Sequence, residues 1–229
     1  LDVDAFDADG FAMNNTDGID IEASRNVLVE GCSFCQNDDG IVLKSGRNRD
    51  GRRLGVPTEN VTIRDCVVRK GHGLLVIGSE ASGGVRNVLM ENCRIDGTAH
   101  RLFYVKTARP RGGFIENVVM RDVKATEVDK EVLAINSSYW ITPSAERRPD
   151  GLAVPHIAGI RLENVRCGKA KMLYAIEGDP EDPVDGVVLD GVTADAVRAP
   201  SVAENVRNLT IDGVRQADPP PTPFKAPHW

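Results

Sequence analysis

The sequence predicts an all-β protein that folds as a right-handed parallel β-helix of about eight coils. Three observations predict this fold. Short apolar runs rich in Val and Ile recur between Gly, Asn and Asp residues, helical periodicity is hard to find, and the runs align on one shared pattern. Such repeats are typical of solenoids, in which each coil completes its core by packing on the next.

The aligned pattern begins at an Asn or Gly residue and has apolar residues at its second, fourth and seventh positions. The second and fourth point to one side of a strand, and a polar pair turns the chain before the seventh points inward. The second positions are Val27, Val61, Val88, Val118, Ile160, Val187 and Leu209; the fourth are Val29, Ile63, Met90, Met120, Leu162, Leu189 and Ile211; the seventh are Cys32, Cys66, Cys93, Val123, Val165, Val192 and Val214. Their irregular spacing suits coils that carry loops, the largest near residues 46–58 and 140–158.

The two ends of the chain differ from the coils between them. Residues 1–25 already alternate like a coil, with Ile19 and Ile21 set against acidic residues, so we expect further coils in front of this segment. The Pro-rich end cannot continue a strand ladder, because proline lacks the N–H. We therefore expect a β-helix domain over residues 1–216 and a tail over residues 217–229.

The five cysteines do not indicate a metal or redox centre. Cys32, Cys66 and Cys93 fill the seventh position of consecutive repeats, which we interpret as a buried stack of small apolar side chains. The paired CxxC spacing of a zinc site is missing from the sequence, and the odd number of cysteines defines no disulfide framework.

Composition excludes some classes of partner. The formal net charge of −6 argues against general nucleic-acid binding, which needs a basic surface. No apolar run approaches the ~18 residues that a membrane span needs, so we expect no membrane partner. An acidic sugar chain is still possible as a substrate, because local cations decide that contact.

Several acidic residues and one histidine are predicted to be vertical neighbours. In a parallel β-helix, equal offsets in adjacent coils stack about 4.8 Å apart. Asp38 and His72 have the same offset in consecutive repeats, and Asp17 precedes Asp39 by one minimal coil of 22 residues. We therefore expect these four side chains to share one region of the surface.

The fourth coil adds a lysine to this region. If Phe103 and Val105 face the core, Tyr104 and Lys106 face the same surface as the carboxylates. Crowded carboxylates repel one another, which raises at least one pKa and keeps an acid protonated near neutral pH. Glycoside hydrolysis uses such a pair, one carboxylic acid and one carboxylate. The simpler interpretation is that these Asp residues only cap polar turns.

Four segments resemble the signature segments of the polygalacturonase family of glycoside hydrolases. That family carries Asn-Thr-Asp, Asp-Asp, Gly-His-Gly and Arg-x-Lys in this order on successive coils. Here they stand as Asn15-Thr16-Asp17, Asp38-Asp39, Gly71-His72-Gly73 and Tyr104-Val105-Lys106. Each motif is weak alone, but four in order at coil spacing are a strong signal.

The resemblance implies an inverting hydrolase of α-linked galacturonic acid chains that needs no metal and no cofactor. It implies that Asp38 is the general acid, and that Asp17 and Asp39 position and deprotonate the attacking water. His72 would tune the acid through a hydrogen bond, and Lys106 would pair with the carboxylate of the bound uronate.

Further substrate contacts are expected around this centre. Asn15 would orient the water or a sugar hydroxyl, and a sugar ring would stack on Tyr139 or on Trp140. The stretch that begins at Arg109 resembles the bacterial exo-acting branch of the family, which makes Arg109 a candidate substrate contact. The basic run 47–53 would form a wall that steers a polyanion and closes one end of the groove.

One departure affects the substrate. The family's substrate-binding arginine falls on Tyr104, and Arg101, three residues earlier, points elsewhere if the strand alternates regularly. Loss of a bidentate carboxylate ligand leaves a decorated or rhamnogalacturonan-type pectin as an alternative substrate.

Two other functions stay open at this point. A pectate-lyase-like enzyme would use β-elimination with calcium and an arginine base, and a non-catalytic β-helix would only bind carbohydrate. The resemblance also implies a secreted or periplasmic protein, and we expect a monomer.

Overall fold

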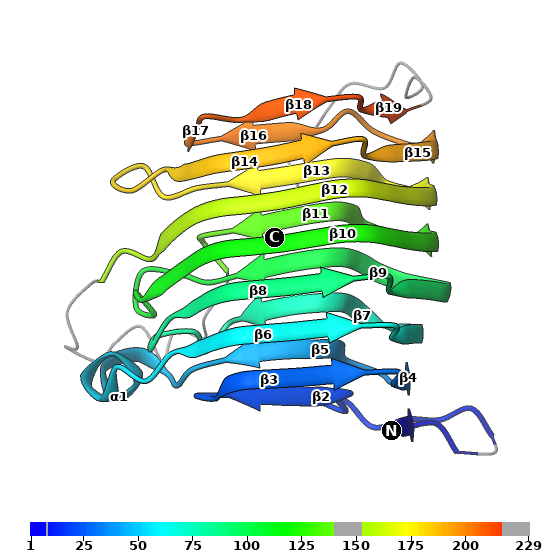
Figure 1. The fold of residues 1–229 in the computed structure, drawn as a ribbon, viewed down its shortest axis with the longest axis horizontal. Coiled ribbons are helices and arrows are strands. Elements are labelled where there is room, and N and C mark those ends of the chain that lie inside the picture. The colour runs from blue at the N-terminus through cyan, green and yellow to red at the C-terminus, as the bar shows by residue number, and fades with distance from the viewer. Residues whose placement is uncertain (8, 140–152, 217–229) are drawn as a thin grey trace.

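The computed structural model describes residues 1–7, 9–139 and 153–216, which wind into a parallel β-helix (Figure 1). Every pairing between its named strands is parallel. Successive coils lie on one another with the N-terminal coil at the bottom of Figure 1 and the β18 coil at the top. The predicted tail over residues 217–229 lies outside the described residues. Within the described part of the chain, no helix has the length and apolar character that a membrane crossing requires.

The strands form three stacks, and the long strands bend so that each contributes to two of them. Stack 1 contains β3 (Arg25–Glu30), β6 (Thr58–Arg64), β8 (Val85–Glu91), the first parts of β10 (Phe114–Val128) and β12 (His156–Ala170), β14 (Val184–Asp190), β17 (Val206–Arg207) and β18 (Thr210–Asp212). Stack 2 contains β1 (Asp2–Asp4), β4 (Ser33–Cys35), the first parts of β7 (Val67–Gly78) and β9 (Arg94–Lys106), the second parts of β10 and β12, β15 (Thr193–Val197) and β19 (Arg215–Gln216). Stack 3 contains β2 (Ile19–Glu22), β5 (Asp39–Lys44), the second parts of β7 and β9, β11 (Glu131–Asn136), β13 (Met172–Glu177) and β16 (Val202–Glu204).

The registers of stack 1 confirm the repeat found in the sequence. Val27 pairs with Val61, and the same column continues through Val88, Val118 and Ile160. The column two residues later, from Val29 to Leu189, is paired in the same way. The apolar period of the sequence therefore determines which residues become neighbours in space.

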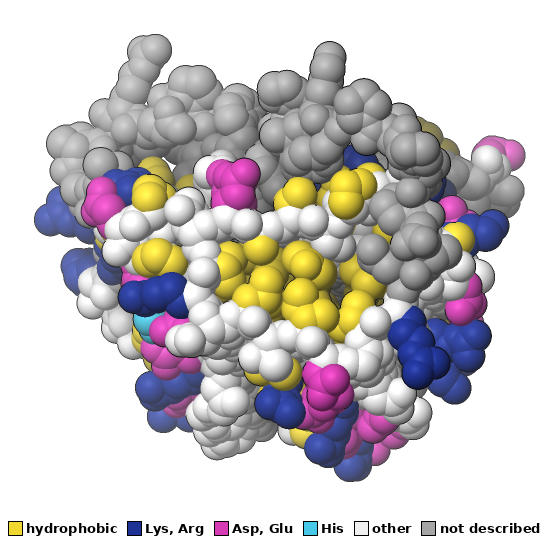
Figure 2. Space-filling view, turned by 90° about the horizontal axis from the view of Figure 1, so that it is seen from above, with side chains coloured by type: hydrophobic (Ala, Val, Ile, Leu, Met, Phe, Trp, Pro, Cys, Tyr) yellow, Lys and Arg dark blue, Asp and Glu magenta, His cyan; other side chains and the backbone are white. Residues whose placement is uncertain are grey.

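The core fills the interior of the coil. Seen from above in Figure 2, apolar side chains gather at the centre of the end, with charged side chains around the outside. Cys66 and Cys93 are buried, and the amide of Cys66 lies 3.4 Å from the thiol of Cys93. These two thiols are therefore part of the packed interior, as the sequence predicted, whereas Cys32 is only partly buried.

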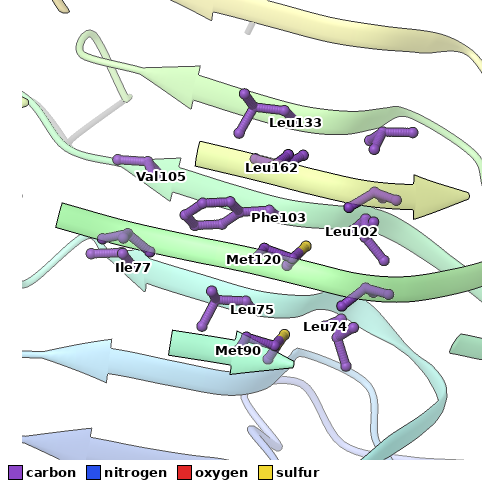
Figure 3. Close-up of a cluster of buried hydrophobic side chains, with 14 of the residues drawn as sticks. Leu74, Leu75, Ile77, Met90, Leu102, Phe103, Val105, Met120, Leu133 and Leu162 are labelled. Atoms are coloured by element: carbon purple, nitrogen blue, oxygen red, sulfur yellow. The ribbon is translucent and has the colours of Figure 1, made fainter. Parts of the chain in front are cut away.

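At the start of stack 3 the regular alternation of side chains breaks. Leu74 and Leu75 are both fully buried, and so are Leu102 and Phe103 one coil later (Figure 3). Two consecutive inward residues are possible because the chain turns a corner between stacks 2 and 3. Arg101 comes just before the inward pair Leu102 and Phe103 and consequently faces outward, and Asp39 occupies the same register position two coils earlier.

The insertion after β5 contains a short helix that the sequence did not predict. The helix α1 (Asn48–Leu54) ends at Gly55, whose left-handed backbone caps it. The Arg52 guanidinium donates to the carbonyls of Pro110 and Arg111 at 2.5 and 3.1 Å, and Arg111 donates back to Asn48 at 2.9 Å. Part of the basic run thus holds two insertions together.

Candidate active site

Asp39 lies at the corner where stack 3 begins, above Asp17 of the preceding coil. Its amide donates to the Asp17 carboxylate at 3.3 Å, and the Gly18 amide donates to the Asp39 carbonyl at 2.8 Å. Asp39 is almost fully buried. The sequence prediction that these two carboxylates stack is confirmed by these contacts.

Asp38 and His72 are also neighbours, as their equal offsets predicted. The Nδ1 atom of His72 lies 3.0 Å from one oxygen of Asp38, and the His72 amide donates to the Asp38 carbonyl at 2.7 Å. The side-chain amide of Asn15 lies 3.4 Å from the other oxygen of Asp38. Asp38 therefore has partners on both carboxylate oxygens.

Lys106 connects the fourth coil to this group. Its ammonium lies 2.7 Å from Asp39, although a whole coil intervenes. The intervening coil presents Gly73 and Gly78 at the positions paired with Asp39 and Lys106, so side chains from either side meet above it. The ammonium also lies 5.8 Å from the Tyr104 ring centre and 5.5 Å from that of Tyr139, which places both tyrosines beside the carboxylates.

Arg101 does not point away, and this expectation was wrong. Its guanidinium carbon lies 4.2 Å from the Tyr104 ring centre, and its Nε donates to the buried carboxylate of Glu131 at 2.8 Å. The expectation assumed regular alternation, but Leu102 and Phe103 both face inward at the corner, which turns Arg101 to the outer face. Tyr104 consequently has two cations near its ring, Arg101 at 4.2 Å and Lys106 at 5.8 Å from the ring centre.

One expected substrate contact, Arg109, is held by other partners. The Arg109 guanidinium binds Asp179 through two hydrogen bonds of 2.8 Å and Glu181 through one of 2.7 Å, so carboxylates of a later coil hold it. Trp140 lies outside the described residues.

The pKa shifts of the three aspartates differ in direction. Burial raises the pKa of Asp39, and the nearby Lys106 ammonium reduces this shift without reversing it. Burial also raises the pKa of Asp17, where the hydrogen bond from Lys44 opposes it and the Asp39 charge reinforces it. The hydrogen bond from His72 lowers the pKa of Asp38. Raised pKa values were expected from repulsion, but burial is the larger cause.

Three of these groups could hold a cation. Single ligand atoms of Asp38, Asp39 and His72 lie within 4.8 Å of one another. The Lys106 ammonium, however, already lies against Asp39, and the charge of Asp39 raises the pKa of Lys106 despite its burial. A positive side chain at this position makes binding of a metal cation unfavourable.

Sequence reasoning missed two members of the surroundings. Lys44 pairs with Asp17 at 3.1 Å and with Asp20 at 2.7 Å. Lys44 lies opposite Glu22 of the preceding coil, and this register position could have indicated that it lies beside the acidic residues. His100 stacks on His72 with ring centres 4.5 Å apart. No sequence motif contains His100, so only the coil register reveals it.

Three aspartates, a histidine and a lysine on one outer face of a parallel β-helix form the kind of carboxylate group that glycoside hydrolysis uses. The chain belongs to family 28 of the glycosyl hydrolases, whose family model matches residues 1–213.

Relatives of this chain agree with that assignment. A probable polygalacturonase of Vitis vinifera is 27% identical over 205 residues, 86% of this chain and 40% of the relative. An exo-poly-alpha-D-galacturonosidase of Dickeya chrysanthemi is 30% identical over 129 residues, 56% of this chain and 21% of the relative.

Solved structures show the same fold. The crystal structure of a hyperthermoactive exopolygalacturonase from Thermotoga maritima matches with a TM-score of 0.76 and 34% identity, over 87% of this chain and 44% of that one. A family 28 exopolygalacturonase from Yersinia enterocolitica matches with a TM-score of 0.73 at 21% identity, over 90% and 37%. This chain thus spans less than half the length of each of these relatives.

Proposed function

We propose that this chain carries the catalytic centre of a hydrolase that cleaves α-linked galacturonic acid chains with inversion, and that it acts from chain ends. The observation that carries the proposal is the contact of Asp38 with His72 beside the Asp17, Asp39 and Lys106 group. Family membership and the names of the relatives support an acidic pectic substrate. The exo preference rests on the exopolygalacturonase structure from Thermotoga maritima and on the loop resemblance.

The lowered pKa of Asp38 is compatible with its role as general acid if His72 supplies the proton. A protonated His72 beside an ionised Asp38 holds the same number of protons as a neutral histidine beside a protonated Asp38. The 3.0 Å contact lets that proton pass to the carboxyl group. Asp38 then protonates the glycosidic oxygen as the bond to the anomeric carbon breaks.

The attacking water loses its proton to a carboxylate of the same centre. Asp17 and Asp39 have raised pKa values, so each accepts a proton more readily than an ordinary aspartate. Water attacks the anomeric carbon from the face opposite the leaving group, which inverts the configuration. Exchange with solvent returns a proton to the His72–Asp38 pair and removes one from the base.

Recognition of the substrate carboxylate falls to Lys106 and its aromatic neighbours. Tyr104 stands where the family has an arginine, and Arg101 beside it is held by Glu131. This arrangement offers fewer free hydrogen-bond donors to a substrate carboxylate than an arginine at position 104 would offer. It therefore favours a decorated or rhamnogalacturonan-type chain as the second candidate substrate. We further propose a monomer that acts in the periplasm or outside the cell, because polymeric pectin does not cross a membrane.

The decisive experiment is Asp38→Asn with product analysis on galacturonate oligomers and branched pectic oligomers. Loss of a general acid lowers kcat by roughly 10²–10⁴-fold, while the oligomer should still bind. Asp96→Asn, a matched change at an ion-paired surface aspartate, should leave kcat unchanged. Proton NMR of the first product should show the β-anomer.

Two results would overturn the proposal. Release of an unsaturated product that absorbs near 235 nm would indicate elimination, the rival lyase reaction. Binding of the oligomers without any new reducing ends from the wild type would indicate a carbohydrate-binding protein.

A further inference from the structure

A pocket of about 430 Å³ lies beside the candidate active site and shares His72 with it. It follows the corner between stacks 2 and 3 and is separate from the outward face that carries Tyr104 and Lys106. We call it the corner pocket, and its lining is Gln36, Asn37, Arg69, Lys70, Gly71, His72, Thr98, His100 and Asp129. Its volume falls within the range of pockets that bind small molecules.

The floor of the corner pocket contains polar atoms that lack a partner in the described part of the chain. Both side-chain polar atoms of Gln36 are buried without a hydrogen bond, and so is one carboxylate oxygen of Asp129. Gln36 is fully buried. Buried polar groups in folded proteins nearly always have a partner. A ligand with hydroxyl groups, or water held beneath it, supplies both the donors and the acceptors that are missing.

The rim of the pocket carries a cation that no carboxylate of the described chain holds. The Lys70 ammonium lies 4.0 Å from the Phe6 ring centre, whereas the neighbouring Arg69 is bound to Ser33 and Asp2. Lys70 is exposed. It can therefore bind the carboxylate of a sugar acid without breaking an existing ion pair.

The wall between the pocket and the active site is a pair of stacked imidazoles. His72 and His100 are nearly parallel, with 12° between their ring planes, and His100 lies 3.8 Å from Asp129. Because His72 also contacts Asp38, an occupant of the pocket touches the same imidazole that serves the acid.

We propose that the corner pocket is a further subsite for one uronic acid unit of the substrate, with Lys70 as its carboxylate ligand, and with Asp129 and, through water beneath the sugar, Gln36 as partners of its hydroxyl groups. This inference rests on the proposed hydrolysis of acidic glycans. The subsite extends substrate recognition from the outward face of stack 3 around the corner, to the corner residues of four successive coils between Gln36 and Asp129.

The test is binding of galacturonate oligomers of two to five units, measured by calorimetry in an Asp38→Asn background. Lys70→Ala should weaken the longest oligomers about tenfold, the loss expected for one exposed charge-assisted contact, and leave the shortest unchanged. Lys124→Ala is the matched control, because Lys124 lies in the outer face of stack 2 away from the pocket. Equal affinity of Lys70→Ala and Lys124→Ala for every oligomer overturns the subsite.

Gln36→Leu gives an independent check on the pocket floor. Removing an unpartnered buried amide should leave the thermal midpoint of the free protein unchanged or higher, while KM for long oligomers rises about threefold or more. A normal KM with a raised midpoint overturns the role of Gln36. If the wild type hydrolyses nothing but Lys70→Ala still weakens binding, the subsite stands and the proposed hydrolysis fails.

Discussion

At the scale of single residues, burial and the neighbouring polar and charged side chains act in opposite directions on the pKa values of the aspartates in the candidate active site. Burial raises the pKa of Asp39, and the nearby Lys106 ammonium offsets only part of that rise. Asp38 is ionised more readily because His72 binds it. Neighbouring carboxyl groups in one sequence motif therefore have opposite pKa shifts, because burial dominates at Asp39 and the hydrogen bond from His72 dominates at Asp38.

The pH dependence of kcat/KM should be a bell on the acid side of neutrality, and Lys44→Gln should change one limb of it. Lys44 lowers the pKa of Asp17 through a hydrogen bond, so its removal lets burial raise that pKa further. Because the base must be ionised, the low-pH limb should move to higher pH by about half a unit or more.

Lys44→Gln should also change the thermal stability of the protein in a way that depends on pH. A carboxyl group whose folded pKa is raised stabilises the fold below its unfolded pKa near 3.8 and loses that contribution as pH rises through the folded value. Lys44→Gln should therefore lower the thermal midpoint more at pH 7 than at pH 4. Asp20→Asn, which removes the other partner of Lys44, should leave the low-pH limb in place. A profile flat from about pH 4 to 9 would contradict the acid and base assignment.

At the scale of elements, stack 1 is held by a ladder of asparagine side chains on its outer side. Asn60 donates to Asn26 at 3.1 Å and accepts from Asn87 at 3.1 Å, and Asn117 donates to Asn87 at 2.9 Å. All four have positive φ between 53° and 57°. Asparagine suits this position because it tolerates the left-handed backbone and bonds to the same residue of the next coil.

Two substitutions at Asn60 separate these contributions. Asn60→Gly keeps the backbone freedom and loses the two amide bonds, which should cost about 1 kcal/mol of unfolding free energy. Asn60→Ala adds the cost of a left-handed residue with a Cβ, about 1 kcal/mol more. Chemical denaturation measures both. The ladder would be irrelevant if Asn60→Gly were as stable as the wild type.

At the scale of the whole molecule, contacts between distant loops supplement the stacked coils. Arg109 follows β9, and Asp179, which it binds by two hydrogen bonds, follows β13, 70 residues later. Asp179 is buried and Arg109 is partly exposed. This clamp, together with the Arg52 contacts to Pro110 and Arg111, ties the insertions on one side of stack 3 to one another.

Arg109→Met distinguishes a clamp from a substrate ligand. If Arg109 serves as a clamp, the thermal midpoint should fall by several degrees because Asp179 is left buried without its partner, with KM unchanged. The double variant Arg109→Met with Asp179→Asn should recover part of that loss. A raised KM at an unchanged midpoint would instead restore Arg109 as a substrate contact.

The winding of this chain and the vertical neighbours within it follow from the amino-acid sequence. The apolar period sets which residues of successive coils pair, so the contacts of Asp17 with Asp39 and of Asp38 with His72 follow from spacing alone. The position of Lys106 on the same face followed from the alternation of inward Phe103 and Val105.

The side-chain directions at corners and the contacts between loops depend on how distant segments pack. Inward and outward side chains alternate only within a straight strand. At the corner before stack 3, Leu102 and Phe103 both point inward, so Arg101 points outward and lies over Tyr104. The stack of His72 on His100 depends on a register shift between β7 and β9 that the repeat does not specify. The clamp of Arg109 on Asp179 joins residues 70 positions apart that both follow the strands of their coils. A periodic pattern encodes the coil, and the irregular segments between its periods position the side chains that complete the site.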